Sequence, residues 1–501
     1  MKRKISAIPG IVFMKNSVNL RPMFFALLLQ CVALIWFSGC SLSPKYAQPK
    51  APIPARWPQG TAYKNIKTTP IKTTPGVNRA ENALPVAALS RQKFFSDRHL
   101  LKIINIALKN NLDLRLAALN VERVRALYGV QRAELFPSVD GSGYENKQRL
   151  PSDLSPSGKA VIQKQYGVNL GISSWEIDFF GRIRSLKKQA LENFLATDQA
   201  RISAQISLVS QTAIAYYTLA ADRENLKLAE STLDTQQNSY DLIQSQYRAG
   251  LANELDLRRA QTQVDSARGK AVRYTQQVAQ DQNALNLLCG IHVPETLLPK
   301  GLSDVNVPEN ISAGLSSDVL LNRPDIIAAE HKLKGAYAFI GAARASFFPR
   351  IALITGVGTA SQELSGLFKA GSGTWSFAPD IAVPVFDART WAAYRVSKAQ
   401  KKIAVTQYKK AIQTAFREVA DSLAVQGTVD DQVAAQKSLV DALAATYRLA
   451  VNRYSNGIDS YLSVLDAQRS LFDARQGLIL LRLSKLANEA RLYAVLGGGG
   501  N

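Results

Sequence analysis

One stretch of the chain has the residue pattern of a very long helix. Neither glycine nor proline occurs from Arg182 to Ala249, a run of 68 residues. Apolar residues recur there every seven positions, at Leu219, Leu226, Leu233, Tyr240 and Tyr247, with Ala229 and Ile243 three positions after two of them. A sustained seven-residue period predicts left-handed coiled-coil packing, with these side chains in the helix interface. At about 1.5 Å per residue such a helix reaches roughly 100 Å, which no compact globular core requires.

Two copies of one pattern follow each other along the chain. Residues 110–137 align with 322–349, and residues 246–268 align with 453–475. The offset falls from 212 to 207 between the two alignments, so the first copy holds five more residues, which we assign to the loop around 149–160. The sequence therefore predicts tandem structural repeats over 97–310 and 311–496, with a short glycine-rich tail over 497–501. In the second repeat the seven-residue register continues through Val433, Val440, Tyr447 and Tyr454.

Each repeat also holds a pair of strand-like stretches, expected within 136–178 and 349–387. Apolar residues alternate with others over 166–177, 350–361 and 374–386, and more weakly over 136–147. Strands of about ten residues with alternating faces are typical of transmembrane β-barrels. Four strands cannot close a barrel, and an open sheet edge cannot lie in lipid. Either several chains complete one barrel, or these stretches are not membrane strands.

The first 39 residues have the pattern of a signal peptide. Five basic residues and no acid accompany a fifteen-residue apolar run at 23–37, which is too short to span about 30 Å of hydrocarbon. The run ends in "FSGC", which resembles the lipobox of bacterial lipoproteins, so Cys40 is predicted to carry an N-acyl group and an S-diacylglycerol group. The alternative is a buried thiol near an ordinary cleavage site. Ser41 in place of an aspartate favours the outer membrane.

Residues 40–96 are predicted to be a lipidated tether or wrapping segment. They are rich in lysine, threonine and proline, as in "IKTTPIKTTP" at 66–75. The whole chain has a formal net charge of +22. Because a secreted lipoprotein seldom meets nucleic acid, we expect no nucleic-acid partner, and anionic headgroups of outer-membrane lipid as partners of the basic surface.

The sequence contains no motif for catalysis or for a cofactor. It has no Walker loop, no GxGxxG after a strand and no HExxH. His99, His292 and His331 have no cysteine or acid cluster at ligand spacing, so no metal site is expected. We predict that the protein is not an enzyme and that its sole prosthetic group is the lipid on Cys40.

Several strings of the sequence resemble those of one known family. They are "WEIDFFGRIRS" at 175–185, "NRPDI" at 322–326, "GAARASFFP" at 341–349 and "LDAQRSLF" at 465–472. Together with the lipobox they resemble the outer-membrane factor (TolC) family, most closely its OprM-like, NodT-type efflux lipoproteins. The resemblance implies a mixed α and β fold and a homotrimer. Each chain would give four strands to a 12-stranded transmembrane β-barrel, continued by a long periplasmic α-helical coiled-coil barrel.

The resemblance also implies a function. The protein would be the exit duct in the outer membrane of a Gram-negative bacterium, passively conducting drugs and small toxic compounds to the cell exterior. It would receive them from an inner-membrane resistance-nodulation-division transporter through a periplasmic adaptor (membrane fusion) protein. One alternative is the same duct serving type I protein secretion or metal export. Another is a periplasmic coiled-coil scaffold without a pore, which the strand pairs disfavour.

The duplicated segments 246–268 and 453–475 are predicted to be helical hairpins at the periplasmic end of this duct. Gly250 and Gly457 each follow a long helix and suit the left-handed conformation that reverses the chain. New helices are expected to begin near Glu254 and Tyr461.

The match to the family implies a periplasmic gate in the second hairpin, at Leu462 and Asp466. These residues are four apart and therefore share one helix face. Possible links that hold the gate closed are Arg469, Tyr454 and Asp459, together with Arg259, which takes the place of Asp466 in the first copy. On spacing alone, a leucine and an aspartate on a helix face are more often a packed residue and a solvated one.

Overall fold

The computed structural model describes residues 42–63, 91–305 and 317–498. The predicted signal peptide, Cys40, residues 64–90 of the predicted tether and the last residues of the tail lie outside these ranges. The chain divides into two compact units. The first comprises residues 132–186 and 339–394 together with the N-terminal residues up to Pro44, and the second comprises 45–131, 187–338 and 395–501.

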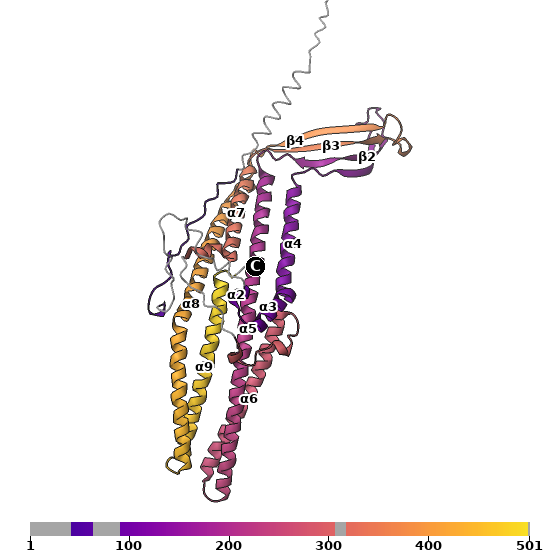
Figure 1. Cartoon of the computed structure of the whole chain (residues 1–501). Coiled ribbons are helices and arrows are strands. Elements are labelled where there is room, and N and C mark those ends of the chain that lie inside the picture. Colours follow the sequence, from indigo (N-terminus) through magenta and orange to yellow (C-terminus); the bar gives the residue numbers. More distant parts are fainter. Residues whose placement is uncertain (1–41, 64–90, 306–316, 499–501) are drawn as a thin grey trace, which may run out of the picture. The chain divides into compact units, whose positions relative to one another are not determined.

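The first unit is built on one antiparallel sheet of four strands in the order β1-β2-β3-β4. The strands are β1 (Asp140–Leu150), β2 (Val161–Glu176), β3 (Arg350–Ser361) and β4 (Gly373–Ala382), and Figure 1 shows them as long neighbouring ribbons. The predicted mixture of helices with four strands per chain is confirmed. Within the chain, β1 and β4 are the two edges of the sheet.

Several of the predicted strand boundaries are wrong. The second strand begins at Val161, five residues before the predicted start at residue 166. The first strand begins at Asp140 and continues to Leu150, so it lies further along the chain than the stretch 136–147. The last strand ends at Ala382 rather than near residue 386. Ala382 already pairs with Arg350, the first residue of β3, so the residues after it have no partner strand. Pro384 also lacks the N–H that a further ladder bond would need.

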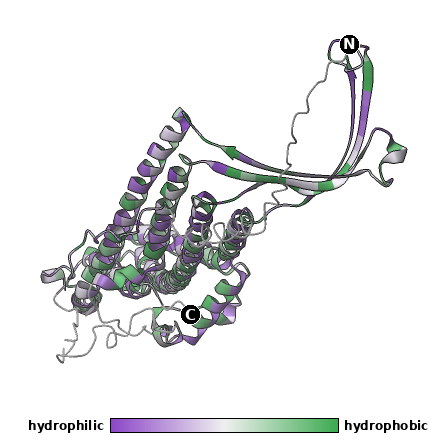
Figure 2. Cartoon of the chain, turned by 90° about the horizontal axis from the view of Figure 1, so that it is seen from above, coloured by the Kyte–Doolittle hydropathy of each residue, from purple (hydrophilic) through white to green (hydrophobic). Residues whose placement is uncertain are grey.

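Most of the length of four long helices lies in the second unit. They are α5 (Arg182–Arg248), α6 (Glu254–Cys289), α8 (Ala388–Ser455) and α9 (Tyr461–Val495), and Figure 1 shows α5 with α6 and α8 with α9 as antiparallel hairpins. Helix α5 has 67 residues, which confirms the predicted long helix. Figure 2 shows hydrophobic and hydrophilic residues mixed along the helices. No helix in the described part of the chain has the length and apolar character needed to cross a lipid bilayer.

The remaining helices are short or of intermediate length. The α-helices are α2 (Arg91–Phe94), α3 (Arg98–Asn110), α4 (Leu112–Ala133) and α7 (Pro324–Ala345). The 3-10 helices are η1 (Thr61–Tyr63), η3 (Glu295–Leu297), η4 (Leu302–Asp304), η5 (Ser317–Asn322) and η6 (Leu364–Gly366). Helix α3 begins after Asp97, whose carboxylate accepts hydrogen bonds from the N–H groups of His99 and Leu100 at 2.8 and 3.1 Å.

The seven-residue pattern of α5 is buried along only part of the helix. Leu219 and Ile243 are buried, whereas Tyr247 is 41% exposed. The expectation that Tyr247 packs in the helix interface is therefore wrong for a single chain. Near its end, α5 has only the neighbouring hairpins of one chain to pack against, and Tyr247 lies outside the small core that they form.

Residues 45–57, which we call the strap, pack against α7 and α8 in the second unit. The Tyr46 hydroxyl donates to Glu330 at 2.9 Å, and the Gln48 side-chain amide donates to the Tyr408 hydroxyl at 3.0 Å. The Trp57 ring stacks on Phe416 with 5.2 Å between centroids. This part of the predicted tether is therefore packed on the helices by both polar and aromatic contacts.

Candidate functional site

The two hairpin turns have the same hydrogen-bond geometry. Gly250 and Gly457 have φ of 78° and 71°, the left-handed region expected of them. After α5, the Gly250 N–H donates to Tyr247 and the Leu251 N–H donates to Gln246, at 3.0 and 2.8 Å. After α8, the N–H groups of residues 457 and 458 donate to the carbonyls of residues 454 and 453, both at 2.9 Å. These two hydrogen bonds together form the Schellman motif, which satisfies the last free carbonyls of each helix.

A small hydrophobic core joins the two hairpins near their turns. It is formed by Ile243 and Ala260 of the first hairpin with Ala450, Tyr461, Val464, Leu465 and Ala467 of the second. These residues are each less than 10% exposed. The next helices begin at Glu254 and Tyr461, so the core lies within the first two turns of α6 and α9. It fixes which side of α9 faces inward and which side is left exposed.

Leu462 and Asp466 lie on the exposed side of α9. Leu462 is 52% exposed, and the Asp466 side chain is 66% exposed. Arg469 Nη2 lies 2.6 Å from Asp466 Oδ1, so the acid of the predicted gate has an ion-pair partner in its own helix. Asp473 is also exposed and is seven positions after Asp466, which places it on the same face. The sequence interpretation missed Asp473, although its spacing was visible.

Asp459 is held by an arginine that the sequence interpretation missed. Arg453 Nε and Nη2 donate to its two carboxylate oxygens at 2.6 and 3.0 Å across the α8–α9 turn. These hydrogen bonds lower the pKa of Asp459 below its usual value. The Tyr454 ring lies 5.2 Å from the Tyr461 ring, and burial, with a smaller effect of the Asp256 charge, raises the pKa of Tyr454. The turn is therefore closed by one ion pair and one aromatic contact.

Arg259 is not brought to Asp466 within one chain. Its ion pair is with Asp256, three residues earlier in α6, at 3.7 Å. An ion pair between Arg259 and Asp466 does not occur among the described residues of the chain. The same described ranges contain no group of three or more His, Cys, Asp and Glu side chains that could hold a metal ion.

The two faces of the sheet differ in chemistry. Residues that pair across neighbouring strands share a face, and the register sets Leu170 opposite Val357 and Val357 opposite Trp375. We call this side the apolar face, and its members include Tyr166, Val168, Leu170, Ile351, Leu353, Val357, Trp375, Phe377 and Ile381. The other face carries mainly small and polar residues, with Tyr144 and Ile354 as larger exceptions; they include Asp140, Ser142, Asn146, Gln165, Asn169, Gly356, Gly358, Thr374, Ser376 and Asp380.

Large apolar side chains of the sheet are open to solvent in the single chain. Leu170 is 56% exposed, Val357 61% and Trp375 82%. A contiguous exposed apolar surface marks a place that lipid or protein covers. The sheet thus has one face suited to hydrocarbon and one suited to water.

Helix α4 also presents an uncovered apolar face. None of its 22 residues is buried. Leu112, Leu116, Leu119, Leu127 and Val130 are between 49% and 65% exposed. At 100° per residue these five positions fall on one side of the helix, so they form a single stripe, which we call the α4 stripe.

Sequence comparison places the chain in one family. The model of the outer membrane efflux protein family matches residues 103–291 and 315–498. The chain belongs to the outer membrane efflux protein family. It is 47% identical to the solvent efflux pump outer membrane protein SrpC of Pseudomonas putida over 94% of this chain and 98% of that protein. It is 46% identical to the antibiotic efflux pump outer membrane protein ArpC of Pseudomonas putida over 95% of this chain and 96% of that protein.

More distant relatives and solved structures agree with this assignment. The cation efflux system protein CusC of Escherichia coli is 38% identical over 94% of this chain and 97% of that protein. The structure of a membrane protein from Pseudomonas aeruginosa has a TM-score of 0.82 at 36% identity, covering 92% of this chain and 98% of that one. The open state of the MtrE outer membrane channel of Neisseria gonorrhoeae has a TM-score of 0.79 at 36% identity, with the same coverage.

These comparisons confirm the family, the fold class and the location that the sequence predicted. The chain has the fold of TolC-like outer-membrane channels, and it is an outer-membrane exit duct of an efflux system in a Gram-negative bacterium. The family is one of channels rather than of enzymes.

Proposed function

We propose that three copies of this chain form one duct that passively conducts drugs and other small toxic organic compounds out of the cell. The observation that carries this proposal is the two-faced sheet with two open edges, β1 and β4. Within lipid every backbone N–H and C=O must be paired, so an open edge is excluded there. If β4 of each chain pairs with β1 of the next, three chains close a barrel of twelve strands. The apolar face then meets lipid and the polar face lines the pore.

The α4 stripe supports the same assembly from the helical part of the chain. Its five apolar side chains are exposed in the single chain. In the proposed assembly of three chains, each α4 stripe would meet a neighbouring copy in the same orientation. Burying them at about 25 cal/mol per Å² would contribute several kcal/mol per subunit contact. We therefore assign the α4 stripe to the contact between neighbouring chains.

The relatives support small organic compounds as the substrates. SrpC and ArpC are named for solvent and antibiotic efflux, and they are more similar to this chain than CusC, which is named for cation efflux. As the sequence resemblance implies, the partners are a periplasmic adaptor protein and an inner-membrane resistance-nodulation-division transporter. Deleting the gene should raise susceptibility to toluene and antibiotics. Increased susceptibility to copper or silver alone would favour the cation candidate.

The α9 face that carries Leu462 and Asp466 is proposed to close the periplasmic mouth. Three copies of Asp466, each paired with Arg469, would form a charged ring beside an apolar ring of Leu462. Single-channel conductance in a planar bilayer should be small for the wild type and should rise for Asp466→Ala. Asp265→Ala is the matched control, because Asp265 makes the same kind of ion pair, with Arg268 at 3.1 Å, on the first hairpin. If neither the wild type nor Asp466→Ala conducted ions, the proposed duct would be wrong.

The lipid on Cys40 is proposed as the anchor of the mature chain. Within the first unit, Arg344 donates to the Leu42 carbonyl at 3.1 Å, and Ser43 packs at Gly341, where an added Cβ would collide with it. Leu42 is two residues from Cys40, so these contacts support an anchor held beside the sheet unit. Labelling with radioactive palmitate should mark the wild type and not Cys40→Ser. Equal labelling of both proteins would remove the proposed anchor.

A further inference from the structure

Three basic residues gather on the apolar face beyond its hydrophobic part. The register of β1 and β2 sets Lys147 directly opposite Lys164, and Arg149 opposite Ile162. All three cations are exposed, and none of them forms an ion pair with an acid in the described part of the chain. Glu145 is on the same face, where it accepts a hydrogen bond from the Tyr166 hydroxyl at 3.2 Å. Like charges directly across an antiparallel pair are destabilising, so an external anion bound between them would stabilise this arrangement.

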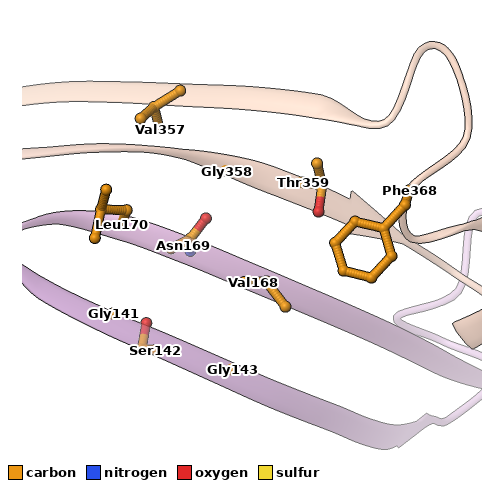
Figure 3. A pocket seen from close by; sticks show the side chains of 10 residues that line it. All are labelled: Gly141, Ser142, Gly143, Val168, Asn169, Leu170, Val357, Gly358, Thr359 and Phe368. Atoms are coloured by element: carbon orange, nitrogen blue, oxygen red, sulfur yellow. The ribbon is translucent and has the colours of Figure 1, made fainter.

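An apolar groove lies on the same face, nearer the start of β1. It has a volume of about 470 Å³ and is lined by Gly141, Gly143, Val168, Leu170, Val357 and Thr359, with Phe368 at one end. Figure 3 shows the Phe368 ring beside Thr359 and Val168. Phe368 reaches there from the β3–β4 loop, which is fixed by the buried Leu367 next to it. The two glycines of β1 leave the floor of the groove open, because a Cβ at Gly141 would meet nothing within 4 Å.

The groove and the cations are aligned along the same strands. Lys164 precedes Val168 by four residues, which corresponds to about 13 Å along a strand. An amphiphile with its acyl chain in the groove would therefore reach the cations with its headgroup. The basic end adjoins the β1–β2 turn, and the groove lies between that end and the start of β1.

We propose that this face holds one molecule of a phosphorylated, multiply acylated glycolipid of the outer leaflet, with a phosphate between Lys147 and Lys164 and one acyl chain in the groove. Charge complementarity favours this occupant over a zwitterionic phospholipid, since the headgroup site carries three cations and a single acid. The inference rests on the proposed barrel, in which the apolar face meets lipid. It adds a specific lipid site to a surface otherwise expected to contact lipid without selection.

Native mass spectrometry of the full-length protein in detergent, titrated with diphosphorylated hexa-acylated lipid A, tests the site. The wild type should retain the lipid, and Lys147→Gln with Lys164→Gln should weaken its binding about tenfold or more, since each basic residue near a membrane surface contributes substantially to anion affinity. Lys409→Gln with Lys437→Gln, at two exposed positions of α8 outside the sheet, is the matched control and should bind as the wild type. Gly141→Leu with Gly143→Val should weaken binding by filling the groove.

Two results would overturn the inference. One is equal binding of lipid A by the wild type and the double lysine variant, and the other is equal binding of lipid A from which both phosphates have been removed. A folding defect is separated by thermal unfolding without lipid, where the double lysine variant should be at least as stable as the wild type because a like-charge pair is removed. Conductance of the same samples separates failure of the barrel from failure of the site. A conducting protein that ignores the phosphates contradicts only the lipid site.

Discussion

Helices α4 and α7 occupy the same place in the two repeats, but only α7 is covered by its own chain. Both have 22 residues. Leu116 and Val130 of α4 align with Ala328 and Ala342 of α7. Leu116 is 63% exposed and Val130 is 65% exposed. Their counterparts Ala328 and Ala342 are 7% and 4% exposed. Small residues allow close packing inside the chain, while larger ones extend to a surface that the chain does not supply.

The strap adds to this difference. Tyr46 packs on α7 through Glu330 and through an edge contact with Tyr337, at 5.5 Å between ring centroids. The duplication has therefore kept the backbone of the helix and changed what covers it. We infer that one copy serves the stability of the subunit and the other serves assembly.

The largest effect is expected when charged side chains are introduced into the α4 stripe. Leu116→Asp with Val130→Asp should abolish the proposed trimer, because each carboxylate would have to be buried without a partner, at a cost of several kcal/mol. Light scattering after size-exclusion chromatography in detergent should then report monomers, and conductance should be lost. Arg125→Asp introduces the same carboxylate on the opposite side of α4 and should leave the trimer intact. Trimers from the doubly substituted protein would end the assignment of α4 to assembly.

Shortening one buried side chain of α7 should lower the stability of the single subunit. Leu333 is fully buried, and Leu333→Ala should lower the free energy of unfolding by about 2–5 kcal/mol through lost packing and the cavity left behind. Urea unfolding followed by circular dichroism measures this change. Leu116→Ala removes the same atoms from an exposed position. If both variants lost the same stability in a monomeric background, the contrast between α4 and α7 would be wrong.

Local signals in the sequence predicted much of the architecture. The long α5, the left-handed Gly250 and Gly457, and the helix starts at Glu254 and Tyr461 all depend on residues close in sequence. The end of β4 at Ala382 could not be read this way, because it is set by where β3 begins. The Arg453 partner of Asp459 and the strap contacts likewise depend on which segments meet in space. The gate at Leu462 and Asp466 came from family resemblance and stays a prediction.

Helices α6 and α9, which correspond to each other in the two repeats, each carry one acid with a raised pKa. When the repeats are aligned, the two acids are one position apart. Helix α6 has Asp281 followed by Gln282, and α9 has Asn488 followed by Glu489. Burial raises the pKa of Glu489 to about 7. Burial, together with a hydrogen bond to Asp222, raises the pKa of Asp281 to about 7 as well. Each copy thus keeps an acid whose pKa is raised mainly by burial.

Replacing Glu489 should remove a pH-dependent loss of stability. The folded protein binds this proton more tightly than the unfolded chain, so stability falls as pH rises from about 4.5 to about 7. Glu489→Gln should therefore raise the free energy of unfolding at pH 8 by about 1–3 kcal/mol and have little effect at pH 4.5. Urea unfolding at the two pH values measures it. Glu230→Gln, at an exposed position of α5, is the control, and equal effects of both substitutions would contradict a role for burial.

The smallest effect is expected at the strap, which covers α7 and has no counterpart described over α4. Tyr46→Phe keeps the ring against Tyr337 but removes the hydrogen bond to Glu330, so the strap should open more easily by about 0.5–1.5 kcal/mol. Hydrogen–deuterium exchange of residues 45–57 measures this local opening. Tyr46→Ala removes the ring as well and should have a larger effect. Faster exchange confined to the strap would mean that α7 is held mainly by the helices, whereas faster exchange reaching α7 would make the strap part of what distinguishes the two copies.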